Sequence, residues 1–157
     1  MRACGMLLPV SSLPSPYGIG AFSESAYRFV DTLKEAGQKY WQILPLGPTS
    51  YGDSPYQSFS TFAGNPYFID LDQLIKEGLL LKEECDACDF GSDPRYIDYG
   101  KLYESRFTLL KKAYRRSLEK PAEAFETFKK ENSEWVGEYG LYMAVKNHFG
   151  GVSWNQW

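Results

Sequence analysis

Apolar residues in positions 1–50 form two short runs with a helical stripe between them. The runs "GMLLPV" at 5–10 and "KYWQILPLG" at 39–47 are interrupted by proline and bounded by serine or glycine, which favours two buried strands. Between them, Ser23 can cap a helix and Gly37 can end it. The order strand, helix, strand within about forty residues predicts a βαβ unit with parallel strands. The stripe consists of Ala26, Phe29, Val30 and Leu33.

Helical periodicity dominates the rest of the chain. We expect one helix from about Leu71 to Gly78, then a polar connector that contains "DFGSDPRYIDYG". Pro121 separates the next and strongest helix from a polar helix, and a last helix is predicted over about 133–148. The stripe of the strongest helix comprises Leu102, Tyr103, Arg106, Phe107, Leu109, Leu110, Ala113, Tyr114 and Leu118.

The segment "SYGDSPYQSFSTFAGNPYFIDLD" at 50–72 follows the second predicted strand and is rich in aromatic rings. A loop needs Gly, Pro, Asp and Ser for its turns, but it does not need the rings. Ligands bind at the carboxyl ends of parallel strands, and sugars suit aromatic platforms beside polar side chains. An Ω-like loop packed on its own side chains is the alternative. The candidate sugar-binding residues are Tyr51, Tyr56 and Phe59 with Asp53, Ser54, Gln57, Ser58 and Asn65.

Composition supports a ligand groove and argues against some partners. The 157 residues include 12 Tyr, 10 Phe and 4 Trp, and rings with polar tips suit partly wet binding surfaces. The formal net charge is −3 and glutamates interleave with the cations of residues 101–130, so we expect no nucleic acid partner. No apolar run approaches transmembrane length, which predicts a cytoplasmic chain without a membrane partner.

Other chemical motifs are weak. "CDAC" at 85–88 has zinc or redox spacing, but three cysteines and one histidine favour a surface helix or loop over a metal site. "YGIGAFSE" at 17–24 resembles a phosphate-binding turn, yet "SSLPSP" separates it from the strand, so Gly18 and Gly20 favour a permissive turn. His148 stands near a helix end and suits packing or the helix dipole. We expect neither a metal nor a cofactor.

Three carboxylates lie in or beside the aromatic loop. Asp72 is expected to begin a helix that Asp70 caps, whereas Asp53 lies between turn residues and is free to face a ligand. A complete small hydrolase that uses Asp53 with Asp70 therefore stays open as one hypothesis.

Three stretches resemble the N-terminal part of the amylomaltases, the bacterial and plant 4-α-glucanotransferases. They are "GMLLPVSSLPSPYGIGAF", "YWQILPLGPTSYGDSPYQSFSTFAGNPYFIDLD" and "FGGVSWNQW", and the middle of the chain carries much less of the resemblance. The resemblance implies an α/β fold: the N-terminal portion of a (β/α)8 TIM barrel of the α-amylase clan with a helical insertion, incomplete as a barrel. Residues 1–72 would supply barrel strands and a glucan-binding loop, and about 73–149 the mainly helical insertion, with the remainder of the catalytic domain absent from 1–157.

The resemblance also implies an activity. Such enzymes transfer α-1,4-glucan segments between maltooligosaccharides, with retention, through a covalent glycosyl-enzyme intermediate and without a cofactor. Tyr56 would stack against the sugar at the cleavage point, and Asn65 and Asp70 would fix the loop. The other substrate-binding positions that the resemblance implies are Asp53, Ser54 and Gln57 near that point and Tyr51 and Tyr99 farther along the glucan.

We expect the 157-residue chain alone to lack transferase activity, because the resemblance puts the catalytic carboxylates beyond residue 157. Incubation with maltotriose, followed by chromatography of the products, tests this expectation. Glucose appearing together with longer oligosaccharides would contradict it. If maltotriose survives, titration of its binding separates a free-standing glucan-binding module, the alternative hypothesis, from a fragment that folds poorly by itself.

Overall fold

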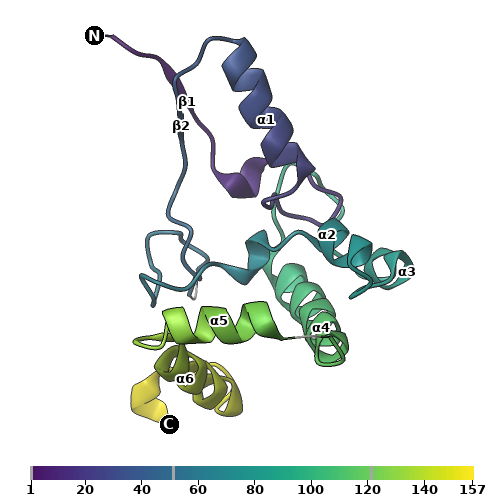
Figure 1. The fold of residues 1–157 in the computed structure, drawn as a ribbon, viewed down its shortest axis with the longest axis vertical. Coiled ribbons are helices and arrows are strands. Elements are labelled where there is room, and N and C mark those ends of the chain that lie inside the picture. The colour runs from purple at the N-terminus through teal and green to yellow at the C-terminus, as the bar shows by residue number, and fades with distance from the viewer. Residues whose placement is uncertain (1, 51, 121) are drawn as a thin grey trace.

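The computed structural model describes residues 2–50, 52–120 and 122–157, and helices dominate them (Figure 1). The elements follow the predicted order, with α3 as the helix that periodicity did not predict. No helix within the described ranges is both long enough and apolar enough to cross a membrane. The helices and strands are β1 (Gly5–Leu7), α1 (Glu24–Glu35), β2 (Tyr40–Gln42), α2 (Leu71–Lys76), α3 (Lys82–Asp86), α4 (Tyr99–Ser117), α5 (Glu123–Glu131) and α6 (Val136–His148).

Strands β1 and β2 pair in parallel, as the strand, helix, strand order predicts. Met6 lies opposite Trp41 and Leu7 opposite Gln42. The N–H of Leu8 then donates to the carbonyl oxygen of Gln42 at 3.0 Å. The indole N–H of Trp41 adds a bond to the carbonyl oxygen of Leu8 at 2.8 Å. Because the strands are parallel, their carboxyl ends lie at the same edge of the pair.

Helix α1 begins and ends at the predicted residues. The hydroxyl oxygen of Ser23 accepts a hydrogen bond from the N–H of Ser25 at 3.3 Å, which caps the first turn. Gly37 has a φ of 71°, and its N–H donates to the carbonyl oxygen of Lys34 at 3.0 Å. This left-handed glycine ends the helix and turns the chain back toward β2.

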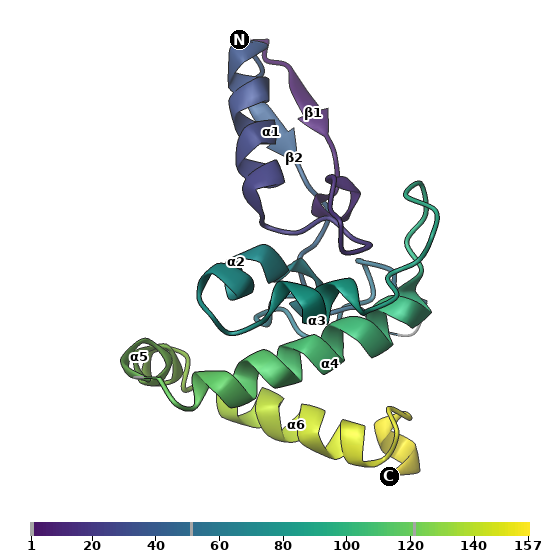
Figure 2. The ribbon, with the colours of Figure 1, turned by 90° about the vertical axis from the view of Figure 1, so that its right-hand side faces the viewer.

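The strands are exposed, so the prediction that they are buried is wrong. Met6 is 47% exposed and Leu7 is 55% exposed. Helix α1 runs beside the pair (Figure 2), and the ring of Phe29 meets that of Trp41 edge-on at 5.1 Å. Parallel strands become fully buried only when helices cover both faces. In the described part of the chain, α1 is the helix that covers them.

Helix α4 supplies the centre of the apolar core. Leu102 and Leu109 are 0% exposed, which confirms the predicted stripe at these two positions. Three other positions of that stripe, Tyr103, Tyr114 and Leu118, are exposed, because α4 packs on one side only. The buried residues from other segments that cluster with α4 are Tyr17, Ile19, Tyr67, Leu71, Leu80 and Cys85.

Arg106 is a charged residue on the buried face of α4 and is only 1% exposed. Its Nη2 donates to the carbonyl oxygen of Ile69, while its Nε has no hydrogen-bond partner among the described residues. Burial lowers the pKa of Arg106 to about 10, and the charge of Asp70 partly offsets this effect. The guanidinium therefore attaches α4 to the segment that leads into α2.

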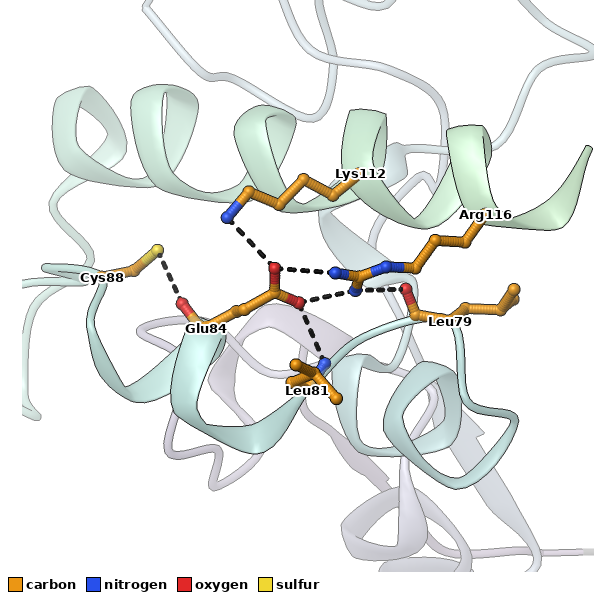
Figure 3. Close-up of polar contacts among 6 residues, drawn as sticks. All are labelled: Leu79, Leu81, Glu84, Cys88, Lys112 and Arg116. Carbon is orange, nitrogen blue, oxygen red and sulfur yellow. Dashed lines mark hydrogen bonds and ion pairs between the residues drawn. The ribbon is translucent and has the colours of Figure 1, made fainter.

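The carboxylate of Glu84 holds α3 to α4 (Figure 3). Arg116 donates to both of its oxygens, from Nη1 at 2.6 Å and from Nη2 at 2.9 Å. Lys112 lies 3.3 Å from Oε1, and the N–H of Leu81 donates to Oε2 at 3.0 Å. The hydrogen bonds from Arg116 and then from Leu81 lower the pKa of Glu84 to about 2.

The "CDAC" segment forms the C-terminal end of α3 and the turn after it. Cys85 is 1% exposed and belongs to the core, and the thiol of Cys88 donates to the carbonyl oxygen of Glu84 at 3.4 Å (Figure 3). The prediction of a surface helix or loop is therefore wrong for Cys85. Within the described ranges, no group of three or more His, Cys, Asp or Glu residues is placed to hold a metal ion.

We expect Glu84→Gln to lower the free energy of unfolding at neutral pH, because it removes the carboxylate that Arg116 and Lys112 contact. The pKa of Glu84 falls from 4.5 to about 2 on folding, so the carboxylate stabilises the fold above about pH 4.5. That stabilisation is lost as the pH falls toward about 2. Urea unfolding of wild type and variant across this range measures the difference. Glu83→Gln, at an exposed neighbour on α3, is the matched control, and a pH-independent difference for Glu84→Gln would contradict the prediction.

Candidate functional site

The aromatic segment after β2 is a loop whose ends are tied together. The N–H of Asn65 donates to the carbonyl oxygen of Leu46 at 2.8 Å, so residues 47–64 leave and rejoin the body of the protein at one point. Asn65 is 8% exposed, and its Oδ1 accepts from the N–H of Tyr67 at 2.9 Å. Asp70 caps α2 in the same manner, through the N–H of Asp72 at 3.1 Å. Asn65 and Asp70 thus fix the end of the loop, as the resemblance implied.

Asp53 has a left-handed backbone conformation within this loop. Its φ is 54°, directly after Gly52 with a φ of 90°. Aspartate tolerates this region better than most residues, because its short polar side chain can hydrogen-bond locally. The N–H of Asp53 donates to the carbonyl oxygen of Ser50 at 3.0 Å, and the hydroxyl of Thr49 lies 3.4 Å from Oδ1. This turn places the carboxylate in the wall of a cavity.

The cavity has a volume of about 190 Å³ and lies where the chain leaves the carboxyl ends of β1 and β2. Asp53 is its only carboxylate among the described residues, and hydroxyl groups and an amide supply further polar atoms. This mixture suits a neutral ligand that has both hydroxyl groups and apolar ring faces. The lining residues are Pro9, Val10, Ser11, Ile19, Leu44, Pro45, Leu46, Thr49, Asp53, Pro55, Asn65, Phe68 and Tyr99.

The two glycines of "YGIG" shape the turn behind this cavity. Gly18 has a φ of 76°, and a Cβ at Gly20 would lie 2.1 Å from the carbonyl oxygen of Val10. Only glycine allows so close an approach of two backbones. The prediction of a permissive turn is therefore confirmed.

Asp53 interacts electrostatically with two tyrosines from other segments. Burial raises the pKa of Asp53, and the hydrogen bond from Thr49 partly offsets this. Burial and then the charge of Asp53 raise the pKa of Tyr67 to about 12, and the same two causes raise the pKa of Tyr99. A tyrosine hydroxyl can donate a hydrogen bond to a ligand. Their rings lie 6.0 Å apart.

The structure brings two of the predicted site residues together and leaves three elsewhere on the loop. Asp53 and Tyr99 both line the cavity. The three that do not line it are Ser54, Tyr56 and Gln57. The side chain of Tyr56 is 73% exposed, and its N–H lies 3.4 Å from the hydroxyl oxygen of Ser54. Tyr51, which was also predicted, lies outside the described residues.

Two rings of the loop pack against rings of α6 and of Trp135, the residue before it. Phe59 lies nearly parallel to Tyr139, with ring centroids 6.3 Å apart and an angle of 11°. Phe62 stacks on Trp135 at 5.8 Å and 19°. Phe59 was predicted as a sugar platform, but packing on α6 explains its presence. These partners lie outside the loop, so the alternative of a loop packed on its own side chains does not describe them either.

Asp70 lies in a different hollow, of about 400 Å³, beside α1 and α2. The hydroxyl of Tyr17 donates to the carboxylate of Asp72 there at 2.6 Å. Asp53 and Asp70 therefore do not share a cavity in the described structure. The hypothesis of a small hydrolase that uses this pair gains no geometric support.

Sequence reasoning missed the residues that line the cavity from the segment after β1. Ser11 contributes a hydroxyl group, and Pro9 and Val10 contribute apolar wall. Their position in the sequence indicates this role, because the residues that follow two parallel strands lie at the same edge of the sheet.

Comparison with known proteins gives a consistent result. A family model described as "4-alpha-glucanotransferase" matches residues 8–157. A 4-alpha-glucanotransferase of Streptococcus pneumoniae is 52% identical over 157 residues, and that of Clostridium butyricum is 53% identical over 148 residues. These alignments cover 99% and 94% of this chain but 31% and 30% of the relatives, so the chain spans about a third of their length.

A solved structure has the same fold over the whole of this chain. It is titled "Amylomaltase from Streptococcus agalactiae in complex with acarbose" and superposes with a TM-score of 0.95 at 45% sequence identity. The match covers 100% of this chain and 32% of the amylomaltase chain. The resemblance that the sequence motifs suggested is thus confirmed.

We expect Asp53→Asn to lower the pKa of both Tyr67 and Tyr99, because the charge of Asp53 helps to raise them. The phenol resonances of 13C-labelled tyrosine, followed by NMR as the pH rises, measure the two values, and Tyr99→Phe assigns one of them. Asp93→Asn is the matched control, because Asp93 bonds to Arg95 on the surface. Unchanged tyrosine titration in Asp53→Asn would contradict the geometry of the site.

Proposed function

The chain belongs to the 4-alpha-glucanotransferase family, and on that premise we propose that its natural protein transfers α-1,4-glucan segments between maltooligosaccharides. The described residues supply one wall of the glucan site. The observation that carries this proposal is the cavity at the carboxyl ends of β1 and β2, which Asp53 of the aromatic loop and Tyr99 of α4 both line. The similar Streptococcus agalactiae amylomaltase was solved in complex with acarbose, which supports a ligand-binding function for the family.

We also propose that residues 1–72 belong to a (β/α)8 barrel and that about 73–149 form a helical insertion in it. The parallel βαβ unit is the repeating element of such a barrel, and its binding loops follow the carboxyl ends of the strands. The position of the cavity at that edge agrees with this architecture. The helices α3 to α6 follow one another without an intervening strand among the described residues, as an insertion would.

The proposed reaction needs two carboxyl groups. One carboxylate attacks the anomeric carbon while another carboxyl group protonates the departing glycosidic oxygen, and the 4-hydroxyl of a second glucan then replaces the enzyme carboxylate. Retention requires the two groups to lie about 5–5.5 Å apart. The described cavity contains Asp53 as its one carboxylate. We therefore assign Asp53 to binding, and place the nucleophile and the acid in the part of the relatives that this chain does not cover.

Exclusion of water is the second requirement for transfer, because water competes with the acceptor hydroxyl. A loop that carries apolar rings over the reacting sugar would limit the entry of water. Tyr56 is suited to this role, because its ring is 73% exposed and free to lie against a ligand. Ser54 and Gln57 are its polar neighbours on the loop and would hydrogen-bond to the hydroxyl groups of the same sugar. Tyr51 and Tyr99 would contact the glucan farther from the cleavage point.

A glucan-binding module without catalysis is the second candidate function. Asp53 is the single carboxylate that the described residues contribute to the cavity, which favours this candidate because binding needs no catalytic pair. The two candidates differ in their products. A binding module would show saturable binding of maltotriose by calorimetry but would release neither glucose nor longer oligosaccharides. The transferase would bind maltotriose and also release glucose and longer oligosaccharides.

We expect Tyr56→Ala in the natural protein at its full length to reduce kcat/KM for maltotriose by roughly 30-fold, which corresponds to the loss of about 2 kcal/mol from a stacked aromatic anchor. Initial rates of glucose release over a range of maltotriose concentrations measure this. Tyr27→Ala is the matched control, because Tyr27 is also 73% exposed but lies on α1. Equal kinetics in wild type and Tyr56→Ala would exclude the proposed stacking role.

A further inference from the structure

Helix α6 is attached to the rest of the structure through aromatic rings. None of its residues is buried, although it carries the half-buried rings of Tyr139 and Tyr142. Figure 1 shows α5 and α6 below the loop that follows β2. The aromatic partners of α6 in that loop are Phe59 and Phe62. Helix α6 thus contacts the segment that carries the proposed glucan-binding residues.

The contacts form two adjoining stacks. Phe59 lies 6.3 Å from Tyr139 and 6.1 Å from Tyr142, with the ammonium of Lys146 5.4 Å from its ring centroid. In the second stack, Phe62 lies on Trp135 at 5.8 Å. These distances fall within the range in which aromatic pairs and cation–π pairs are attractive.

Trp135 links the two stacks and is itself held in place. Its ring meets Tyr139 at 6.0 Å and Phe128 of α5 at 6.3 Å, both edge-on. Its indole N–H donates to Oδ1 of Asn132 at 3.1 Å. Phe128 of α5, Trp135 and Tyr139 of α6 therefore form one aromatic cluster that contacts the loop.

The loop has few other attachments beyond its closed base. Its hydrogen bonds in the described structure are local: Asp53 to Ser50, Gln57 to Ser54, and the hydroxyl of Ser58 to the carbonyl oxygen of Ser60. Within the described ranges, no hydrogen bond joins residues 48–64 to another segment. Besides the cavity wall to which Asp53 and Pro55 contribute, the loop contacts other segments through the ring of Phe59, which is half-buried, and the ring of Phe62, which stacks on Trp135 but stays 70% exposed.

We propose that Tyr139 of α6 and Trp135, the residue before α6, are positioning residues for the glucan-binding loop, a role that rests on the proposed function. They act through Phe59 and Phe62, which are three and six positions after Tyr56. By stacking on these rings, they keep the loop in the conformation that presents Tyr56 to the sugar. When only a fraction of the molecules holds the binding conformation, the apparent affinity falls by that fraction. Loss of the stack should therefore raise KM and leave kcat nearly unchanged.

The test compares Tyr139→Ala, Tyr139→Phe and Tyr114→Ala with wild type in the natural protein at its full length. Tyr139→Ala removes a stacked ring, and we expect KM for maltotriose to rise about 2- to 10-fold, with kcat within about twofold. Tyr139→Phe keeps the ring and should restore the wild-type KM. Tyr114→Ala is the matched control, because Tyr114 is 61% exposed on α4.

Hydrogen exchange measured by mass spectrometry supplies a readout that does not depend on activity. In Tyr139→Ala, amides of residues 52–64 should exchange about 2- to 10-fold faster, while those of α4 keep their wild-type rates and show that the core is intact. Trp135→Ala should accelerate the same amides, so a folding defect in one variant does not decide the result.

The outcomes separate the positioning role from the proposed function. Wild-type loop exchange in both alanine variants would overturn the positioning role. Faster loop exchange with an unchanged KM would also overturn it, because the contact would then be structural only. If the wild-type protein releases no glucose from maltotriose, the proposed function itself fails, and the exchange rates still decide whether α6 positions the loop.

Discussion

Parallel pairing of β1 with β2 is the constraint on which the candidate site depends. Two consecutive strands can be parallel only if the chain between them runs back to the edge of the sheet where the first strand began. Helix α1, which Ser23 caps and Gly37 ends, makes this return between β1 and β2. Both carboxyl ends then meet at one edge, so residues far apart in sequence line one cavity. Ser11 from the segment after β1 and Asp53 from the loop after β2 meet there for this reason.

The charged groups of the structure fall into two kinds, which differ in how their charge is compensated. Glu84 receives hydrogen bonds from Arg116 and Leu81, so its charged form is favoured and its pKa falls. Such a group joins two helices and stabilises the fold. Asp53 has one long contact to Thr49, and burial raises its pKa. A carboxylate with so little compensation inside a cavity is available to a ligand, which agrees with its proposed role in binding.

The aromatic content of the loop has two explanations, and the structure separates them. Tyr67 is buried and contacts Tyr99 beside the cavity, whereas Phe59 and Phe62 stack on α6. Tyr56 remains exposed. The helical region from α3 to α6 is therefore not independent of the loop: α4 contributes the ring of Tyr99 to the cavity, and rings of α6 contact Phe59. The prediction of a sugar groove did not distinguish the rings of the loop that pack on other segments from those that stay exposed.

Local order and family were determined by the sequence itself. Helix caps, the left-handed glycines and the two parallel strands depend on residues close together in the chain, and Ser23, Gly37 and Asp70 act as predicted. The string from Gly52 to Tyr67 was specific enough to indicate the family. Such local patterns did not determine which segments pack against each helix or strand. Burial depends on how many layers cover a strand or a helix, so Met6 is exposed although its run is apolar.

Only the tertiary structure decided which ring of the loop packs and which stays exposed. Phe59 and Tyr56 are three positions apart in one loop, and no local pattern tells them apart. The choice depends on Tyr139, eighty residues beyond Phe59. The pairing of Asp53 with Tyr99 likewise depends on how α4 packs against the turn before α2. Contacts between distant segments arise from packing, and a sequence pattern specifies them only through the fold.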